Sequence, residues 1–408
     1  MTVLRIGICV LVVFAVATFG AVEPWAVFVL ELGASALFLW WAVLVARHKT
    51  SEIAFSPVFW PLLGIVIVGL LQYFVPLSVY PYLTKLELMR WAAYVLLLFL
   101  WAQSFQTPRQ WAEFLWFLVC LGFVVAVFGI LQDLTSNGKL YWFRELRYGG
   151  FPYGPYVNRN HFAGLMELVI PLGLATLAIQ GVRRQQLPLF ALLTALPIGA
   201  LFLSASRGGV VAFGCEVAAL IILLVMRHGE KRHLWMFLAV LALAGGLVAW
   251  LGIGQVVSRF REVRNPEVTE SQRISMMRGA IHIFEAYPWT GTGLGTTISV
   301  YPRFETQYDG KTVDHVHNDH LELLAETGVA GGICWIVFIL MLAGYSIRNL
   351  YSRNPPLIQG LQIGALVGCF GLLIHGLVDF NLHIPSNALL FFLLAGIACT
   401  HPANDDAN

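Results

Sequence analysis

Apolar runs long enough to cross a lipid bilayer recur from one end of the chain to the other. A transmembrane helix needs roughly 17 to 25 mostly apolar residues, because the hydrocarbon core holds no water to bind exposed peptide groups. Runs of this length lie near 4–20, 25–46, 58–76, 89–105, 113–132, 161–180, 187–203, 209–226, 234–252, 321–346, 358–378 and 387–400. The sequence therefore predicts an all-α polytopic membrane protein of about twelve transmembrane helices.

Composition favours the same class. Of the 408 residues, 58% are hydrophobic and 12% are charged, which is about half the charged share of an average soluble domain. The six cysteines all fall inside apolar runs and form no CxxC pair. Disulfides and a thiolate metal site are therefore not expected.

Basic residues in the short connections orient the predicted bundle, because cytoplasmic loops carry an excess of lysine and arginine. With the N-terminus in the cytoplasm, one face holds Arg5, Arg47, Lys49, Arg109, Arg183, Arg184, Arg227, Lys231, Arg232, Arg348 and Arg353. The short connections of the other face hold only Lys85, Arg90 and Arg207. Two long connections, 133–160 and 253–320, then lie on the outer face.

The first apolar run has a second interpretation. Arg5 precedes it and Ala15-Val16-Ala17 resembles a signal peptide cleavage site, so the run is either a first helix or a cleaved leader. Both interpretations leave the topology downstream unchanged.

The two long outer loops are rich in aromatic residues and glycine. Loops of this length without structure of their own are uncommon unless they are functional. Apolar residues recur at helical spacing in 271–286, which predicts an amphipathic helix with two arginines beside its buried face. That face consists of Ile274, Met277, Ile281 and Phe284, and the arginines are Arg273 and Arg278. Such a helix either builds a site or lies on the membrane, where its arginines meet anionic headgroups.

The segment SASRGG places Arg207 at the outer end of the seventh predicted span. A guanidinium is a planar fork that binds two phosphate oxygens, and the following glycines allow a ligand or backbone to come close. Arg207 therefore either binds an anionic headgroup or extends from a helix end to the membrane surface.

The densest set of titratable side chains lies at the outer end of the tenth span. It consists of Asp314, His315, His317, Asp319 and His320. A neutral imidazole beside a carboxylate is suited to act as a general base near pH 7. A zinc site is the alternative, although the segment lacks an HExxH-type pattern. A third interpretation is that the histidines cap the helix through hydrogen bonds.

Two smaller polar groups flank predicted spans. They are Asn158, Arg159, Asn160 and His161 before the sixth span, and His375, Asp379, Asn381 and His383 after the eleventh. Polar residues in or beside spans are costly and often functional, but hydrogen bonds that fix loops to the bundle explain most of them. The acidic residues in or near spans are expected to pair with arginines: Glu167, Glu216, Glu322 and Glu326.

Together these segments resemble the O-antigen ligase family, the bacterial membrane glycosyltransferases that include lipid A-core ligases and O-antigen or exopolysaccharide polymerases. The resemblance covers about 150–396. In family order it consists of NRNHFAG, SRGG, R-x(14)-P-x-x-G-x-G-x-G from Arg273 to Gly295, HNDHLELLAETGVAG, and D-x(5)-P from Asp379 to Pro385.

The resemblance implies a GT-C-like helical fold with a long, partly helical periplasmic loop between the ninth and tenth helices. Residues 1–132 would then form the five N-terminal helices and residues 133–400 the ligase-like region. Residues 401–408 would form a disordered tail.

The resemblance also implies a site. His317 would be the catalytic base, and Arg207 and Arg273 would hold a diphosphate, with Arg278 a weaker candidate. Supporting roles would fall to Asn160, His161, Asn318, Glu326 and Asp379. Aromatic side chains could stack on sugar rings, namely those of Tyr141, Trp142, Tyr153, Tyr156 and Trp289.

The implied enzyme is a metal-independent inverting glycosyltransferase without a cofactor, in the bacterial cytoplasmic (inner) membrane with its site facing the periplasm. Its partners would be an undecaprenyl diphosphate-linked glycan donor, a glycan or lipid A-core acceptor and membrane lipids, without nucleic acid. A small-solute or anion transporter is the alternative, and it predicts charges near the bilayer midplane and interrupted helices. Because the charges in this sequence gather at the outer surface and no pair of interrupted spans stands out, glycosyl transfer is favoured.

Overall fold

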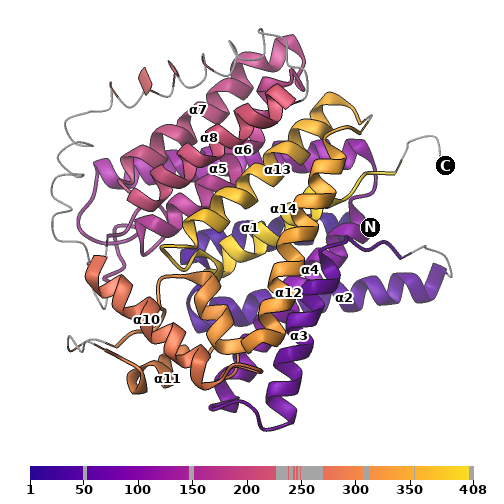
Figure 1. Cartoon of the computed structure of the whole chain (residues 1–408). Helices are drawn as coiled ribbons and strands as arrows, with labels where there is room; N and C mark the ends of the chain where they lie inside the picture. The colour runs from indigo at the N-terminus through magenta and orange to yellow at the C-terminus, as the bar shows by residue number, and fades with distance from the viewer. Residues whose placement is uncertain are drawn as a thin grey trace.

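The computed structural model describes residues 1–48, 53–146, 151–226, 270–306, 312–352 and 354–403, together with a few single residues between these ranges. In the described ranges the regular secondary structure is helical, apart from two isolated β-bridges (Figure 1).

The helices follow one another along the chain with short connections. The N-terminal ones are α1 (Thr2–Ala17), α2 (Pro24–His48), α3 (Phe59–Phe74), α4 (Pro81–Ser104) and α5 (Pro108–Leu134). They are followed by α6 (Arg159–Ala178), α7 (Leu187–Leu203), α8 (Arg207–Met226), α10 (Glu270–Ala286) and α11 (Thr297–Val300). The C-terminal ones are α12 (Asp319–Asn349), α13 (Pro356–His375) and α14 (Pro385–Cys399). Single 3-10 turns are η1 (Phe19–Ala21), η2 (Arg184–Gln186), η3 (Tyr301–Arg303) and η4 (Asn381–His383).

Each predicted span within the described residues coincides with a helix, and the amphipathic helix predicted over 271–286 is α10. The predicted span 234–252 and much of the outer loop 253–320 lie outside the described residues. Among the described helices, seven are long and apolar enough to cross a membrane, and α1, α3 and α14 are shorter apolar helices. The chain is thus a helical, multi-pass membrane protein.

Ion pairs bring two of the predicted cytoplasmic arginines to the same end of the bundle. Arg5 and Arg109 both pair with Glu113, at 3.9 and 3.0 Å. This agrees with the predicted topology, in which α1 and α5 both begin on the same side. Five other basic residues used in that prediction lie outside the described residues: Lys49, Arg227, Lys231, Arg232 and Arg353.

Helix α4 begins before the predicted span 89–105. Proline at the first turn suits a helix start, because its missing N–H would have no partner there, and Pro81 takes this position. The polar first turns are stabilised by an ion pair of 2.8 Å between Glu87 and Arg90. The hydropathy pattern therefore marked only the apolar part of a longer helix.

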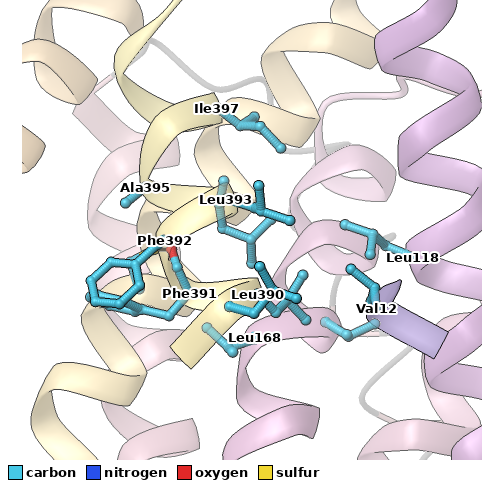
Figure 2. Packing of buried hydrophobic residues seen from close by; sticks show 14 of the residues in the cluster. Val12, Leu118, Leu168, Leu390, Phe391, Phe392, Leu393, Ala395 and Ile397 are labelled. Carbon is cyan, nitrogen blue, oxygen red and sulfur yellow. Dashed lines mark hydrogen bonds between the residues drawn. The ribbon is translucent and has the colours of Figure 1, made fainter. Parts of the chain in front are cut away.

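The centre of the bundle is formed by α6, α13 and α14. The apolar part of α6 is completely buried, and every residue of α14 is buried. Figure 2 shows the side chains of α14 packed against Leu168 of α6, Val12 of α1 and Leu118 of α5. An apolar helix without a polar face belongs in such a position.

A seam of glycines explains why α13 lies so close to α6. Gly360, Gly364 and Gly368 recur every four residues and share one face of α13. A methyl group on Gly360 would lie 2.6 Å from the Cα atom of Thr176, and one on Gly364 would lie 2.5 Å from that of Leu172. Only glycine allows the two backbones to approach this closely.

Helix α12 is interrupted at Gly328, which has φ 62° and ψ −161°. Among the described helices this is a single break rather than the pair of broken helices expected of a transporter. Helices α10 and α11 lie beside the first half of α12 at one edge of the molecule (Figure 1). The break and the two outer helices therefore belong to the same region.

Candidate active site

Two irregular segments, one before α12 and one after α13, are fixed to each other by hydrogen bonds. The Asn318 side chain caps α12 by accepting from the N–H groups of His320 and Leu321, at 3.1 and 2.9 Å. It also donates to the carbonyl of Leu377 at 3.0 Å, and the N–H of Asp319 donates to the carbonyl of Gly376 at 2.9 Å. The predicted supporting residue Asn318 is therefore a helix cap that joins the two segments.

His317 immediately precedes this cap in a left-handed backbone conformation, with φ 53°. A non-glycine residue in this region is strained, and such positions cluster at functional sites. Its Nδ1 atom lies 3.5 Å from Oδ1 of Asp379, within ion-pair distance but without a hydrogen bond. The side chain is 12% exposed, so the imidazole is held from within while one edge remains accessible.

Asp379 is buried beneath His317 and collects several donors. It accepts from Nδ2 of Asn160 at 2.6 Å and from the N–H of Phe380 at 2.9 Å, and Nε2 of His161 lies 3.9 Å away. Burial alone would raise the pKa of Asp379, but the imidazoles of His317, His161 and His375 outweigh it and hold this pKa well below its usual range. The structure thus brings together four residues predicted for the site: Asn160, His161, His317 and Asp379.

Phe380 is the common neighbour of the histidines, and the sequence analysis missed it. Its ring centroid lies 4.8 Å from that of His161, 4.5 Å from that of His315 and 4.9 Å from that of His317. An aromatic ring at this position excludes water from the inner side of the imidazoles. Its place directly after Asp379 in the D-x(5)-P stretch was the available signal.

A second cluster adjoins the first and consists of His315, Asp319, Glu322 and His383. His315 Nδ1 lies 2.7 Å from Glu322 Oε1, His383 Nε2 lies 3.4 Å from the same oxygen, and His383 Nδ1 lies 3.0 Å from Asp319 Oδ1. Burial alone would lower the pKa of His383, but the carboxylates of Glu322 and Asp319 outweigh it and raise this pKa to about 10. His315, Glu322 and His383 have the spacing to hold a metal ion. The absence of a bound metal therefore stays a prediction.

The third histidine of the DHVHNDH segment is structural. His320 Nε2 binds the carbonyl of Leu373 at 2.9 Å, and Nδ1 accepts from the indole of Trp335 at 2.9 Å. Both ring nitrogens are thus used in fixing α12 to α13 and within α12. Of the interpretations offered for this segment, hydrogen bonding at the helix start applies to His320.

Arg207 is exposed at the start of α8, and its neighbours show what the SRGG turn is for. A methyl group on Gly208 would lie 2.5 Å from Nε2 of His375, and one on Gly209 would lie 2.6 Å from Cβ of Ala163. The glycines therefore let α8 approach the end of α13 and the start of α6, the two helices that flank Asp379. Arg207 begins α8 at this end of the bundle.

The two arginines of α10 are placed differently. Arg273 is partly buried and its Nε atom is inaccessible, whereas Arg278 is exposed. Arg273 shares a helical face with Met276, Ala280 and Ile283, which pack with Val313 and Val316 of the segment that carries His317. Arg273 thus lies on the side of α10 that faces the candidate site, and Arg278 does not.

The predicted buried face of α10 is wrong. Ile274 and Ile281 are 45% and 42% exposed, while Gly279 and Ala280 lie inward. A methyl group on Gly279 would lie 2.6 Å from the Tyr301 ring. Small residues permit the close contact that stabilises the helix here, so hydrophobicity alone selected the wrong face.

Glu326 has a structural role at the break in α12, apart from His317. Its carboxylate accepts from the N–H groups of Gly295 and Thr297, at 2.8 and 3.0 Å. Gly291 has φ 66°, and a methyl group there would collide with the Glu326 backbone. The GTGLG sequence is thus a turn that packs into the interrupted helix, as expected from the missing strand before it.

The expectation that buried acids pair with arginines is wrong for three of the four. Glu167 binds His375 Nδ1 at 2.8 Å, Glu322 pairs with His315 and His383, and Glu326 binds backbone N–H groups. Within the described residues, neither carboxylate oxygen of Glu216 has a hydrogen-bond partner. Histidines rather than arginines are therefore the partners of Glu167 and Glu322.

Two of the five aromatic residues proposed to meet sugars are unsuited to it. Tyr153 and Tyr156 are 3% and 1% exposed, and the Tyr156 hydroxyl is bound to Ser386 and Asn387. Tyr156 thus fixes the segment before α6 to the start of α14, and Tyr153 packs on Phe162 of α6. Trp142 and Trp289 are 41% and 75% exposed and stay candidates.

Comparison with known proteins agrees with the resemblance seen in the motifs. Residues 190–336 match the family model described as O-antigen ligase, while a search of curated proteins gives no match. The matched region includes Arg207, Arg273 and His317, and Asn160 and Asp379 lie outside it. Residues 190–336 of this chain are thus similar to the O-antigen ligase family, in agreement with the motifs.

Proposed function

We propose that this protein is a metal-independent, inverting glycosyltransferase that moves a glycan from undecaprenyl diphosphate to an acceptor sugar hydroxyl on the periplasmic side of the inner membrane. The observation that carries the proposal is the pair of His317 and the buried Asp379, at the end of the bundle where α8 and α10 present arginines. The match of residues 190–336 to the O-antigen ligase family model supports the reaction class.

In the proposed reaction His317 is the base. Asp379 takes the Nδ1 side of the imidazole, which leaves Nε2 to accept the proton of the acceptor hydroxyl. The acceptor oxygen forms a bond to the anomeric carbon as the bond from that carbon to the diphosphate oxygen breaks. Attack from the opposite side inverts the anomeric centre, and undecaprenyl diphosphate leaves with the bonding electrons.

The arginines would stabilise the leaving group. Negative charge develops on the diphosphate as the glycosidic bond breaks, and a preorganised guanidinium there stabilises the transition state. Losing one such donor costs about 2–4 kcal/mol in other enzymes. Arg273 is the better placed of the two in α10, because its face of the helix packs on the His317 segment. Arg207 would contribute from the start of α8.

The donor and acceptor follow from the same assignment. The polyprenyl tail of the donor would lie among membrane lipids beside the helices, and the acceptor would be lipid A-core for a ligase or another lipid-linked glycan for a polymerase. Residues 133–400 would form the catalytic region, on a scaffold completed by the helices of 1–132.

Transfer of glycan from undecaprenyl diphosphate by the purified protein in liposomes tests the proposal, with each acceptor supplied in turn and with EDTA present. We expect His317→Ala, Arg207→Ala and Arg273→Ala each to lose transfer while inserting normally. His282→Ala is the matched control, because His282 is exposed on α10. Full transfer by His317→Ala would refute the assignment of the base.

One observation favours transport as a second candidate function. Glu216 lies midway along α8 and is 1% exposed, near the buried Glu167–His375 pair. Buried ionisable groups within a span often mark an ion pathway, and these were not among the surface charges on which the sequence argument relied. Proton or anion flux into liposomes that Glu216→Gln abolishes, without any glycan transfer, would place transport first.

A further inference from the structure

We propose that His315, Glu322 and His383 form a binding site for one divalent transition-metal ion such as Zn²⁺, which would hold together the two segments that carry His317 and Asp379. The site is distinct from the proposed catalytic groups and goes beyond the proposed transfer reaction. It uses residues of the segment before α12, of the first turn of α12 and of η4.

The donor atoms already converge. One atom from each of the three side chains lies within 4.8 Å of the others, and the distances to Glu322 Oε1 are 2.7 Å from His315 Nδ1 and 3.4 Å from His383 Nε2. Ligands around a tetrahedral zinc ion are roughly 3.3 Å apart, given metal–ligand bonds of about 2.0–2.1 Å. Small rotations of the two imidazoles would therefore be sufficient to admit the ion.

The hydrogen-bond partners of His383 and Glu322 resemble those that orient the ligands in known metal sites. Asp319 Oδ1 lies 3.0 Å from His383 Nδ1, so this nitrogen donates, and a metal ion that displaces the proton from Nε2 would bind this atom on the side that faces Glu322. A carboxylate that orients a histidine in this way is typical of metal sites. Glu322 Oε2 accepts from the N–H of Val316 at 2.9 Å, which fixes that carboxylate and leaves Oε1 to bind the ion.

The charge of the cluster also suits a cation. Asp319 and Glu322 are 2% and 1% exposed. In the part of the chain that the structure describes, their ion pairs are with histidines rather than with lysine or arginine. Buried carboxylates are stable only when paired or bound to a metal. His315 and His383 are 27% and 13% exposed at their side chains, which gives the ion a route from solvent and leaves a position for water.

The proposed ion would not take part in the transfer reaction. His315 stacks on Phe380 with an interplanar angle of 25°, whereas His317 meets the same ring at 73°. The two sites therefore share a neighbour but no ligand. Because His315 belongs to the segment before α12 and His383 to the segment after Asp379, an ion bound to both would limit the separation of His317 and Asp379.

Metal retention by the full-length protein tests this site independently of transfer activity. The protein would be purified in detergent through a tag without histidine, stripped with EDTA and dialysed against one equivalent of Co²⁺ or Zn²⁺. We expect about one ion per chain by elemental analysis, and Co²⁺ absorption bands of a four- or five-coordinate ion. His315→Gln and His383→Gln should each lower retention at least tenfold, and His282→Gln should not.

The outcomes are distinguishable. Wild-type protein that retains no ion after dialysis, or a His315→Gln/His383→Gln double variant that retains as much as wild type, overturns the metal site. Metal retention by the wild-type protein can refute the site by itself, so the test still works if a variant fails to fold. Loss of transfer in His317→Ala with normal metal retention would separate the two sites, whereas absence of transfer in every preparation would count against the proposed function only.

Discussion

Replacing Asp379 with asparagine should disable the proposed base while leaving the bundle intact. The substitution keeps the shape of the side chain and one carbonyl oxygen, so the N–H of Phe380, now 2.9 Å away, retains an acceptor. What is lost is the negative charge beside Nδ1 of His317, at 3.5 Å, together with the oxygen that accepts from Nδ2 of Asn160 at 2.6 Å. A positioned general base contributes about 10²–10⁴-fold to a rate, equivalent to about 3–5 kcal/mol. We expect kcat to fall within that range.

The pH dependence sharpens this prediction. The pKa of Asp379 is lowered in the folded protein, so its carboxylate contributes above the unfolded pKa of about 3.9 and is lost only as the pH falls through the folded value. The carboxylate therefore stays charged from about pH 5.5 to about pH 8, and the loss of rate in Asp379→Asn should be present at both pH values. Single-turnover transfer from undecaprenyl diphosphate-linked glycan measures it. A variant with wild-type kcat at both pH values would refute the role given to this carboxylate.

Three further outcomes follow from the geometry. Arg273→Ala should lower the transfer rate about 30- to 1000-fold, which corresponds to the loss of about 2–4 kcal/mol from one transition-state donor. Arg278 is exposed, so Arg278→Ala should change the rate less than about threefold. Equal losses in the two variants would contradict the helical face assigned to α10. Gly328→Ala should lower the melting temperature, because φ is 62° and the added methyl group meets the backbone of the GTGLG turn, and an unchanged thermal melt would count against that packing. Gly364→Leu should abolish stable insertion or expression, since the side chain would displace α6 from α13. Normal expression of this variant would contradict the close approach of the α6 and α13 backbones.

Most of the fold could be predicted because, in a helical membrane protein, an apolar run long enough to cross the bilayer must form a helix. The predicted span 187–203 coincides with α7, where both ends are marked by polar residues. The start of α4 could not be found in this way, because Lys85, Glu87 and Arg90 lie inside a helix whose early turns are polar. The face of α10 was misjudged for a related reason, since Gly279 and Ala280 are buried but contribute little hydrophobicity.

The residue types of the candidate site could be predicted from the sequence, but which side chains contact each other could not. The histidine-rich segment and Asp379 were recognised as separate groups, and their convergence depends on how α12 and α13 are joined. No periodicity along the chain reveals that Asn318 reaches the carbonyl of Leu377, or that Glu322 meets His383 rather than an arginine. Contacts between residues about sixty positions apart are properties of the packing, which short motifs do not encode.

The positions of the proposed catalytic groups depend on the close approach of α6 and α13 at the glycine seam. Asn160 lies in the first turn of α6, and Asp379 follows the end of α13. The 2.6 Å hydrogen bond between them therefore spans the same pair of helices that Gly360, Gly364 and Gly368 bring together. Since Asp379 in turn holds His317, a displacement of α13 by the width of a methyl group would be felt at the base. We therefore expect substitutions at these three glycines to change the geometry of the proposed site at the end of the bundle.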